Sequence, residues 1–162
     1  MNTLNNLIRY ICAVYPHSHE LSNARLTKLI YLADWESIKA TGNQVTDIYW
    51  YFDNYGPFVH NVYEVANEDP EIEIVKTQTI YGTPKVMFRY EGDIPDIDSN
   101  LKKILDSVIE NTKNLYWNDF IKYVYSTPPI EGSNRYTFLK LNDFVGQSCK
   151  YSTLNTTSSQ NN

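Results

Sequence analysis

Three histidines and one nearby glutamate are the side chains best suited to metal or acid–base chemistry. His17, His19 and Glu20 fall within four positions and could chelate a metal ion from a loop. A zinc site needs a second pair of ligands, and none follows at the expected spacing. His60 could act as a general base, but no serine or cysteine stands in a nucleophile elbow. We therefore interpret these residues as solvated or structural, and predict no catalytic residue and no metal site.

One enzyme hypothesis stays open, because carboxylate pairs are defined by their distance in space and the chain has 19 acidic residues. A small hydrolase or transferase would use Asp34, His60 and neighbouring tyrosines. Asp34 precedes Trp35 in an otherwise apolar segment, where burial would raise the pKa of the carboxyl unless it is paired. An exposed edge of a helix explains Asp34 equally well. Because no signature motif supports catalysis, we predict a protein that is not an enzyme and uses no cofactor.

Glycine spacing and net charge exclude several nucleotide and nucleic-acid functions. The six glycines are never closer than ten residues, so neither a phosphate-binding loop nor a dinucleotide fingerprint can form. With 14 basic and 19 acidic residues, the net charge of −5 creates no field that attracts a phosphate backbone. Direct binding to nucleic acid is therefore not expected.

Apolar segments and cysteines bear on where the protein works. No apolar run approaches the roughly 20 residues that span a bilayer, so we expect no membrane partner. The N-terminus lacks the basic start and small-residue cleavage site of an export signal. Cys12 and Cys149 alone build neither a disulfide framework nor a zinc site. We expect a protein of the reducing cytoplasm.

Tyrosine is unusually frequent, with 14 residues in the chain. The densest cluster places four tyrosines around a tryptophan and a phenylalanine: Tyr49, Trp50, Tyr51, Phe52, Tyr55 and Tyr63. Tyrosine offers a large and fairly rigid apolar area with a polar tip, which suits a protein-binding surface. A half-buried sheet would use the same residue types, and both interpretations stay open.

The elements that must position these residues begin with two predicted helices. Apolar residues recur at helical spacing over residues 4–15 and stop at Pro16. A second helix is capped by Ser22 and ends before Gly42. Its apolar stripe is wide, which predicts a central helix buried on two sides.

The next segment contains a connector and a third helix. Residues 45–54 are β-branched and aromatic, so they form either a strand or an irregular connection. Gly56 and Pro57 predict a turn that places Pro57 at the first position of a helix. This helix carries Phe58, Val62 and Val65 on one face and ends near Pro70.

The second half of the chain predicts a hairpin and two further helices. Apolar residues alternate over residues 72–74 and 86–90, on either side of a turn at residues 81–84. Helical spacing returns over residues 101–115 and again over residues 117–124, before the prolines at 128 and 129. Residues 136–144 could pack back as irregular structure.

The predicted fold class is α+β: a mostly helical single domain with a small antiparallel β-hairpin or sheet. We expect this domain to span residues 1–146. Residues 147–162 are a polar tail, rich in Ser, Thr, Asn and Gln, whose composition predicts disorder.

Several short strings occur in a recognisable order. The first runs from Leu26 to Trp35, the second from Gly42 to Thr46, the third from Trp50 to Phe52 and the fourth from Tyr55 to Val59. Together they resemble the Panacea domain of SocA-like antitoxins, in which a K-L-x-Y-like helix precedes a G-x-x-I/V-T segment and a Y-G-P turn. The best match covers residues 26–64, and the hairpin, the helix at 101 and the segment 125–128 follow in the same order.

The resemblance implies an antitoxin of a type II toxin–antitoxin pair, which neutralises a cognate protein toxin by direct binding. Some proteins of this kind are thought to deliver the toxin to a protease, and others are phage-associated, so a protease is a second possible partner. A phage-associated or transcriptional regulatory protein is the alternative function. The resemblance also singles out the positions that carry the motif: Lys28, Tyr31, Asp34, Trp35, Tyr55, Gly56 and Pro57.

These motif positions suggest a shared structural or contact site. Lys28, Tyr31 and Trp35 lie at i, i+3 and i+7 of the second helix, so one helix face carries a cation and two amphipathic rings. The turn at Gly56 would hold Tyr55 at a fixed angle beside that face. Simple packing of Tyr31 and Trp35 against the hairpin is at least as good an interpretation.

Overall fold

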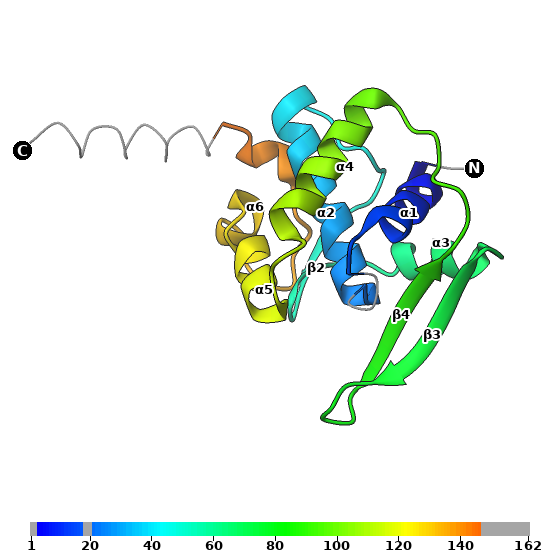
Figure 1. Cartoon of the computed structure of the whole chain (residues 1–162). Coiled ribbons are helices and arrows are strands. Elements are labelled where there is room, and N and C mark those ends of the chain that lie inside the picture. Colours follow the sequence, from blue (N-terminus) through cyan, green and yellow to red (C-terminus); the bar gives the residue numbers. More distant parts are fainter. Residues whose placement is uncertain (1–2, 18–20, 147–162) are drawn as a thin grey trace, which may run out of the picture.

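The central element of the fold is α2 (Asn23–Thr41), around which the other helices and two hairpins are arranged (Figure 1). The computed structural model describes residues 3–17 and 21–146. The hydroxyl of Ser22 accepts a hydrogen bond of 3.2 Å from the backbone N–H of Arg25, and Gly42 ends the helix with a φ of +82°. Thirteen of the nineteen residues of α2 are buried, which confirms a central helix that is covered on several sides.

The helices α1 (Thr3–Val14) and α4 (Ser99–Thr112) pack against α2 and confirm two further predictions. Proline 16 follows α1, as expected of a residue that cannot continue a helix. The carboxylate of Asp98 caps α4 by accepting hydrogen bonds from the backbone N–H groups of Asn100 and Leu101. Because α4 ends at Thr112, Leu115 lies beyond the helix.

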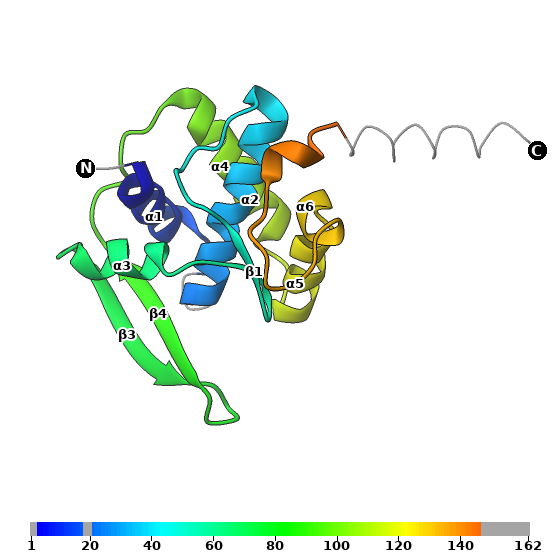
Figure 2. The same cartoon turned by 180° about the vertical axis from the view of Figure 1, so that it is seen from behind.

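The predicted hairpin is present as β3 (Ile72–Gln78) and β4 (Pro84–Tyr90), an antiparallel pair in which Ile74 faces Phe88. Burial in this hairpin runs from its base to the middle of β4, through Ile72, Met87, Phe88 and Tyr90. The other end projects away from the helices in both views (Figures 1 and 2).

The start of the third helix was predicted wrongly. Residues before it form a second hairpin of β1 (Tyr51–Asp53) and β2 (Gly56–Phe58), and α3 (Asn61–Glu68) begins four residues after Pro57. Gly56 has a φ of +103° and pairs with Asp53, so it closes the turn between β1 and β2 and does not start a helix. Pro57 is tolerated in β2 because it lies opposite Phe52, whose N–H points the other way, to the carbonyl of Thr137.

The C-terminal part of the described chain wraps around this second hairpin. The predicted helix α5 (Trp117–Tyr125) is confirmed, but the two prolines that follow begin a further short helix, α6 (Pro128–Glu131). The segment 136–139 runs antiparallel to β1, and the 3-10 helix η2 (Leu141–Phe144) follows it. The predicted tail lies outside the described residues.

Candidate partner-binding site

The carboxylate of Asp34 lies at the centre of the motif region and is fully buried. Its Oδ1 accepts hydrogen bonds from the backbone N–H groups of Val45 at 2.8 Å and Thr46 at 2.9 Å. Its Oδ2 accepts from the Trp50 indole at 2.8 Å, the Gln44 amide at 3.1 Å and the Thr46 hydroxyl at 2.5 Å. Asp34 therefore ties α2 to the connector that leads into β1.

The interpretation of Asp34 as an exposed edge of the helix is wrong, because its side chain is buried and accepts five hydrogen bonds from this chain. Burial raises the pKa of the Asp34 carboxyl, while hydrogen bonds from Thr46, Trp50 and Val45 favour its charged form. All five donors are neutral groups of this chain, and they occupy both carboxylate oxygens. The geometry therefore gives Asp34 a structural role and leaves it no access to a substrate.

Lys28 is a second buried ionisable group, with 2% of its surface exposed. Its Nζ donates a long hydrogen bond of 3.5 Å to the carbonyl of Pro57 and lies 6.0 Å from the ring centre of Phe58. Burial lowers the pKa of Lys28 to about 8, although the negative charge of Asp53 acts in the opposite direction.

Tyr31 and Trp35 complete the predicted helix face, and both point into the core with at most 2% exposure. The hydroxyl of Tyr31 lies 2.8 Å from that of Thr127, which itself donates to the carbonyl of Val124, so Tyr31 is the donor. The ring of Tyr31 meets Trp50 edge to face, with 5.5 Å between the ring centres. Their packing is interior, and a direct contact of either residue with a partner stays a prediction.

The Y-G-P turn holds its three residues in different environments. Gly56 and Pro57 are buried, whereas Tyr55 is 74% exposed. A Cβ atom on Gly56 would lie 3.2 Å from the ring of Tyr125 and 3.7 Å from the Cε atom of Lys28. The turn therefore lies directly over the side chain of Lys28 and presents Tyr55 to solvent.

The outer side of the β1 layer carries three exposed aromatic rings and the half-buried ring of Tyr51. We call this group the aromatic face: Tyr49, Tyr51, Tyr136 and Phe138. Tyr49 is 84% exposed, Tyr136 60% and Phe138 66%. Tyr51 pairs with Phe138 across the two strands, and their ring centres are 5.2 Å apart. The alternate residues Trp50 and Phe52 point inward and are buried, as expected of a sheet with one solvated side.

A comparison with known protein families assigns this chain to one of them. Residues 26–129, well over half of the chain, match the model described as antitoxin SocA-like, Panacea domain. The chain belongs to this family. No curated protein and no solved structure matches the chain.

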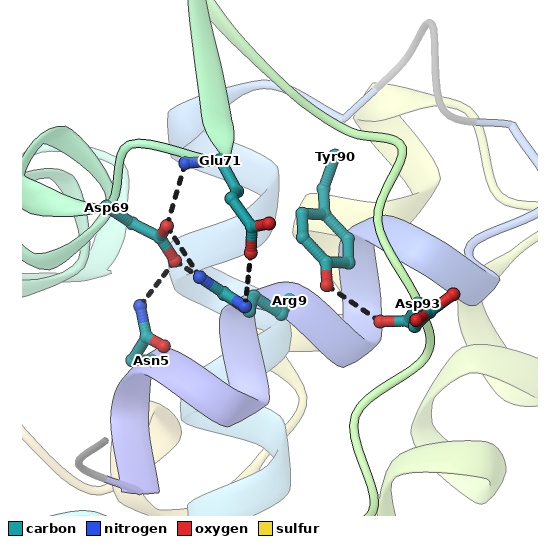
Figure 3. A network of polar contacts seen from close by, with 6 residues as sticks. All are labelled: Asn5, Arg9, Asp69, Glu71, Tyr90 and Asp93. Atoms are coloured by element: carbon teal, nitrogen blue, oxygen red, sulfur yellow. Dashed lines mark hydrogen bonds and ion pairs between the residues drawn. The ribbon is translucent and has the colours of Figure 1, made fainter.

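In this Panacea domain, the hairpin β3–β4 is fixed at its base by a polar network that the sequence did not reveal (Figure 3). The guanidinium of Arg9 on α1 binds both oxygens of Asp69, at 2.6 and 2.8 Å, and its third nitrogen binds Glu71 at 2.7 Å. The same guanidinium lies 5.3 Å from the ring centre of Tyr90 at the end of β4. We call Arg9, Asp69 and Glu71 the hairpin clamp.

The remaining sequence predictions concern the histidines and membrane-spanning segments. His60 is exposed, and its ring packs against Phe58 at 5.2 Å between centres. His19 and Glu20 lie outside the described residues, so the structure does not test their grouping with His17. Within residues 3–17 and 21–146, no helix combines the length and apolar character needed to cross a membrane.

Sequence reasoning missed half of the aromatic face. Tyr136 and Phe138 are about 85 to 89 positions from Tyr51 and Tyr49, and the sequence predicts only irregular structure for residues 136–144. The local signal was two aromatic residues at alternating positions, which is too short to predict a strand. Tyr63, which the sequence grouped with this cluster, instead lies half-buried beside Phe88.

Proposed function

We propose that this Panacea-domain protein is the antitoxin of a type II toxin–antitoxin pair and that it neutralises a cognate protein toxin by direct binding. Its membership of the SocA-like antitoxin family carries the proposal. On this proposal the protein works in the cytoplasm, is not an enzyme and uses no cofactor.

The aromatic face supports binding as the mode of action. Exposed rings held on a sheet lose little conformational entropy when a partner covers them, and Tyr is enriched among residues that dominate binding energy. Tyr55, at the exposed turn of the same hairpin, extends this surface toward the family motif. The buried motif residues, Lys28, Tyr31, Asp34 and Trp35, then act by holding that surface in place.

The proposal is tested by co-expression. The reading frame next to the gene is expressed alone to establish toxicity and then together with the full chain. We expect growth to be rescued and the two proteins to co-purify as a stable complex. A chain that carries Tyr49→Ala and Phe138→Ala should fail to rescue growth. The control is Ile94→Ala, which should still rescue growth, because Ile94 is 60% exposed and lies in the loop before α4. Failure of the wild-type chain both to rescue growth and to bind would reject the proposal.

A further inference from the structure

A groove of about 710 Å³ separates the tip of the β3–β4 hairpin from the helical body. Ile80 and Tyr81 form its wall on the hairpin, and Tyr116 and Trp117, at the start of α5, form the opposite wall. The first turn of α2 also lines the groove. Ile80, Tyr81 and Tyr116 are 92%, 88% and 78% exposed, so both walls present large apolar side chains to water.

The tip of the hairpin is a turn held by hydrogen bonds within residues 79–83. The Thr79 N–H donates to the carbonyl of Thr83 at 2.8 Å, and the Gly82 N–H donates to the carbonyl of Thr79 at 2.9 Å. The Thr79 hydroxyl accepts hydrogen bonds from the N–H groups of Tyr81 and Thr83. This turn fixes Ile80 and Tyr81 away from the core of their own chain, and exposed apolar surface of this kind is typical of a binding site.

The hairpin is held to the helical body both beside the groove and at its base. Beside the groove, the Phe88 N–H donates to the carbonyl of Leu21 at 3.3 Å, and Ser22 forms a bridge with Met87. The hairpin clamp joins the start of β3 to α1, and α1 packs on α2, whose first turn lines the groove. A partner therefore meets a groove that is already formed, which lowers the entropy cost of binding.

The charge of the groove is opposite to that of the whole chain. The chain has a net charge of −5, yet none of the described residues that line the groove is Asp or Glu, while Arg25 and Lys85 are both among them. Arg25 is buried and bound to Tyr15 and to the carbonyl of Leu115. Lys85 is partly exposed and forms no ion pair with any described residue. A carboxylate is the complementary group for this cation.

We propose that this groove binds a short segment of the toxin in which an apolar side chain lies next to a carboxylate. The apolar side chain lies between the hairpin tip and Trp117, and the carboxylate pairs with Lys85. This inference rests on the proposed antitoxin function and names a second contact for the same partner. Phe58 lines the groove and faces Tyr51 in the β1–β2 register, so the groove and the aromatic face are neighbouring surfaces that one partner can cover.

The test measures the affinity of the full chain for the purified product of the neighbouring toxic reading frame by calorimetry. Lys85→Glu should raise the Kd at least about tenfold, because it places like charges together. Lys103→Glu is the matched control, since Lys103 is exposed on α4 and lies outside the groove, and it should change the Kd less than about twofold. Tyr81→Ala should weaken binding about tenfold, and Ile94→Ala should not.

Overlapping peptides that tile the toxin then identify the segment. We expect one peptide with adjacent apolar and acidic residues to bind the wild-type chain and to lose binding to Lys85→Glu. If no peptide binds, or if Lys85→Glu and Tyr81→Ala bind the toxin as the wild type does, the groove proposal is wrong. Equal weakening by Lys85→Glu and Lys103→Glu would also overturn it. In those cases the antitoxin function survives if Tyr49→Ala and Phe138→Ala still abolish binding, whereas a wild-type chain that neither binds nor neutralises the toxin rejects both proposals.

Discussion

The indole N–H of Trp50 donates a hydrogen bond of 2.8 Å to Oδ2 of Asp34, which joins the residue before β1 to the middle of α2 inside the core. Through this contact and four others, one carboxylate positions the connector that carries Tyr49 and leads into β1, where Tyr51 lies. The buried motif residues of the Panacea domain are thus structurally connected to the exposed surface.

Asp34→Asn should lower the free energy of unfolding by about 2–4 kcal/mol, because in either orientation the amide NH₂ faces backbone or side-chain donors that need an acceptor. Urea unfolding followed by fluorescence measures the change. Asp47→Asn is the control, since Asp47 is exposed in the same connector, and it should cost less than about 0.5 kcal/mol. Equal effects of the two substitutions would contradict a structural role for the Asp34 carboxylate.

Lys28 should make the protein more stable at alkaline pH. The pKa of Lys28 is about 8 in the folded protein and about 10.5 in the unfolded chain. Between these pH values the unfolded chain binds more protons than the folded protein, so the free energy of unfolding rises with pH. The full effect is about 3 kcal/mol. Lys28→Met removes the ammonium but keeps an unbranched apolar chain of similar shape, so it should be neutral or stabilising at pH 7 and should abolish this pH-dependent gain. Unfolding curves of both proteins at pH 7 and pH 10 measure the difference, and parallel changes in the two would disprove the assignment.

The hairpin clamp should make the free energy of unfolding depend on pH in the acidic range. The hydrogen bonds from Arg9 lower the pKa of Asp69 from 3.8 to about 2, so this stabilisation is present above pH 4 and is lost as the pH falls toward 2. Asp69→Asn should cost about 2 kcal/mol at neutral pH. Glu71→Gln should cost less than about 1 kcal/mol, because the Glu71 side chain is 59% exposed. Hydrogen exchange should show faster opening of β3 and β4 only in Asp69→Asn, and unchanged exchange would refute the clamp.

Tyr31→Phe removes one buried hydroxyl that is bonded to Thr127, and should cost about 1 kcal/mol without affecting toxin binding. The loss of binding by a folded Tyr31→Phe protein would instead indicate that Tyr31 takes part in the contact. Calorimetry with the toxin, together with thermal unfolding, separates the two outcomes.

Local patterns predicted the elements whose signals lie within a few residues. Ser22 and Gly42 marked both ends of α2, and the alternation on both sides of Gly82 marked the hairpin. Pro57 misled the prediction because proline suits the first turn of a helix and also a strand position whose N–H would point away from the neighbour. A φ value is not visible in a sequence, so the positive φ of Gly56 could not correct the error.

The site could be predicted only in part. The wide apolar stripe of α2 indicated burial, yet Lys28 and Asp34 on the same helix have partners in the segments that follow it, at Pro57 and at residues 44–50. The hairpin clamp joins Arg9 to Asp69, 60 positions apart, and no local pattern pairs two such residues. The groove likewise depends on how three distant elements meet, which is a property of packing.

Titration of toxin activity with the purified full chain tests the central claim most directly. The account predicts that inhibition rises linearly and ends at a fixed molar ratio, with both proteins eluting together as one complex. Tyr49→Ala with Phe138→Ala should remove this end point, while Ile94→Ala should preserve it. Complete loss of toxin activity at a trace amount of the chain, with no complex, would show turnover and contradict neutralisation by binding.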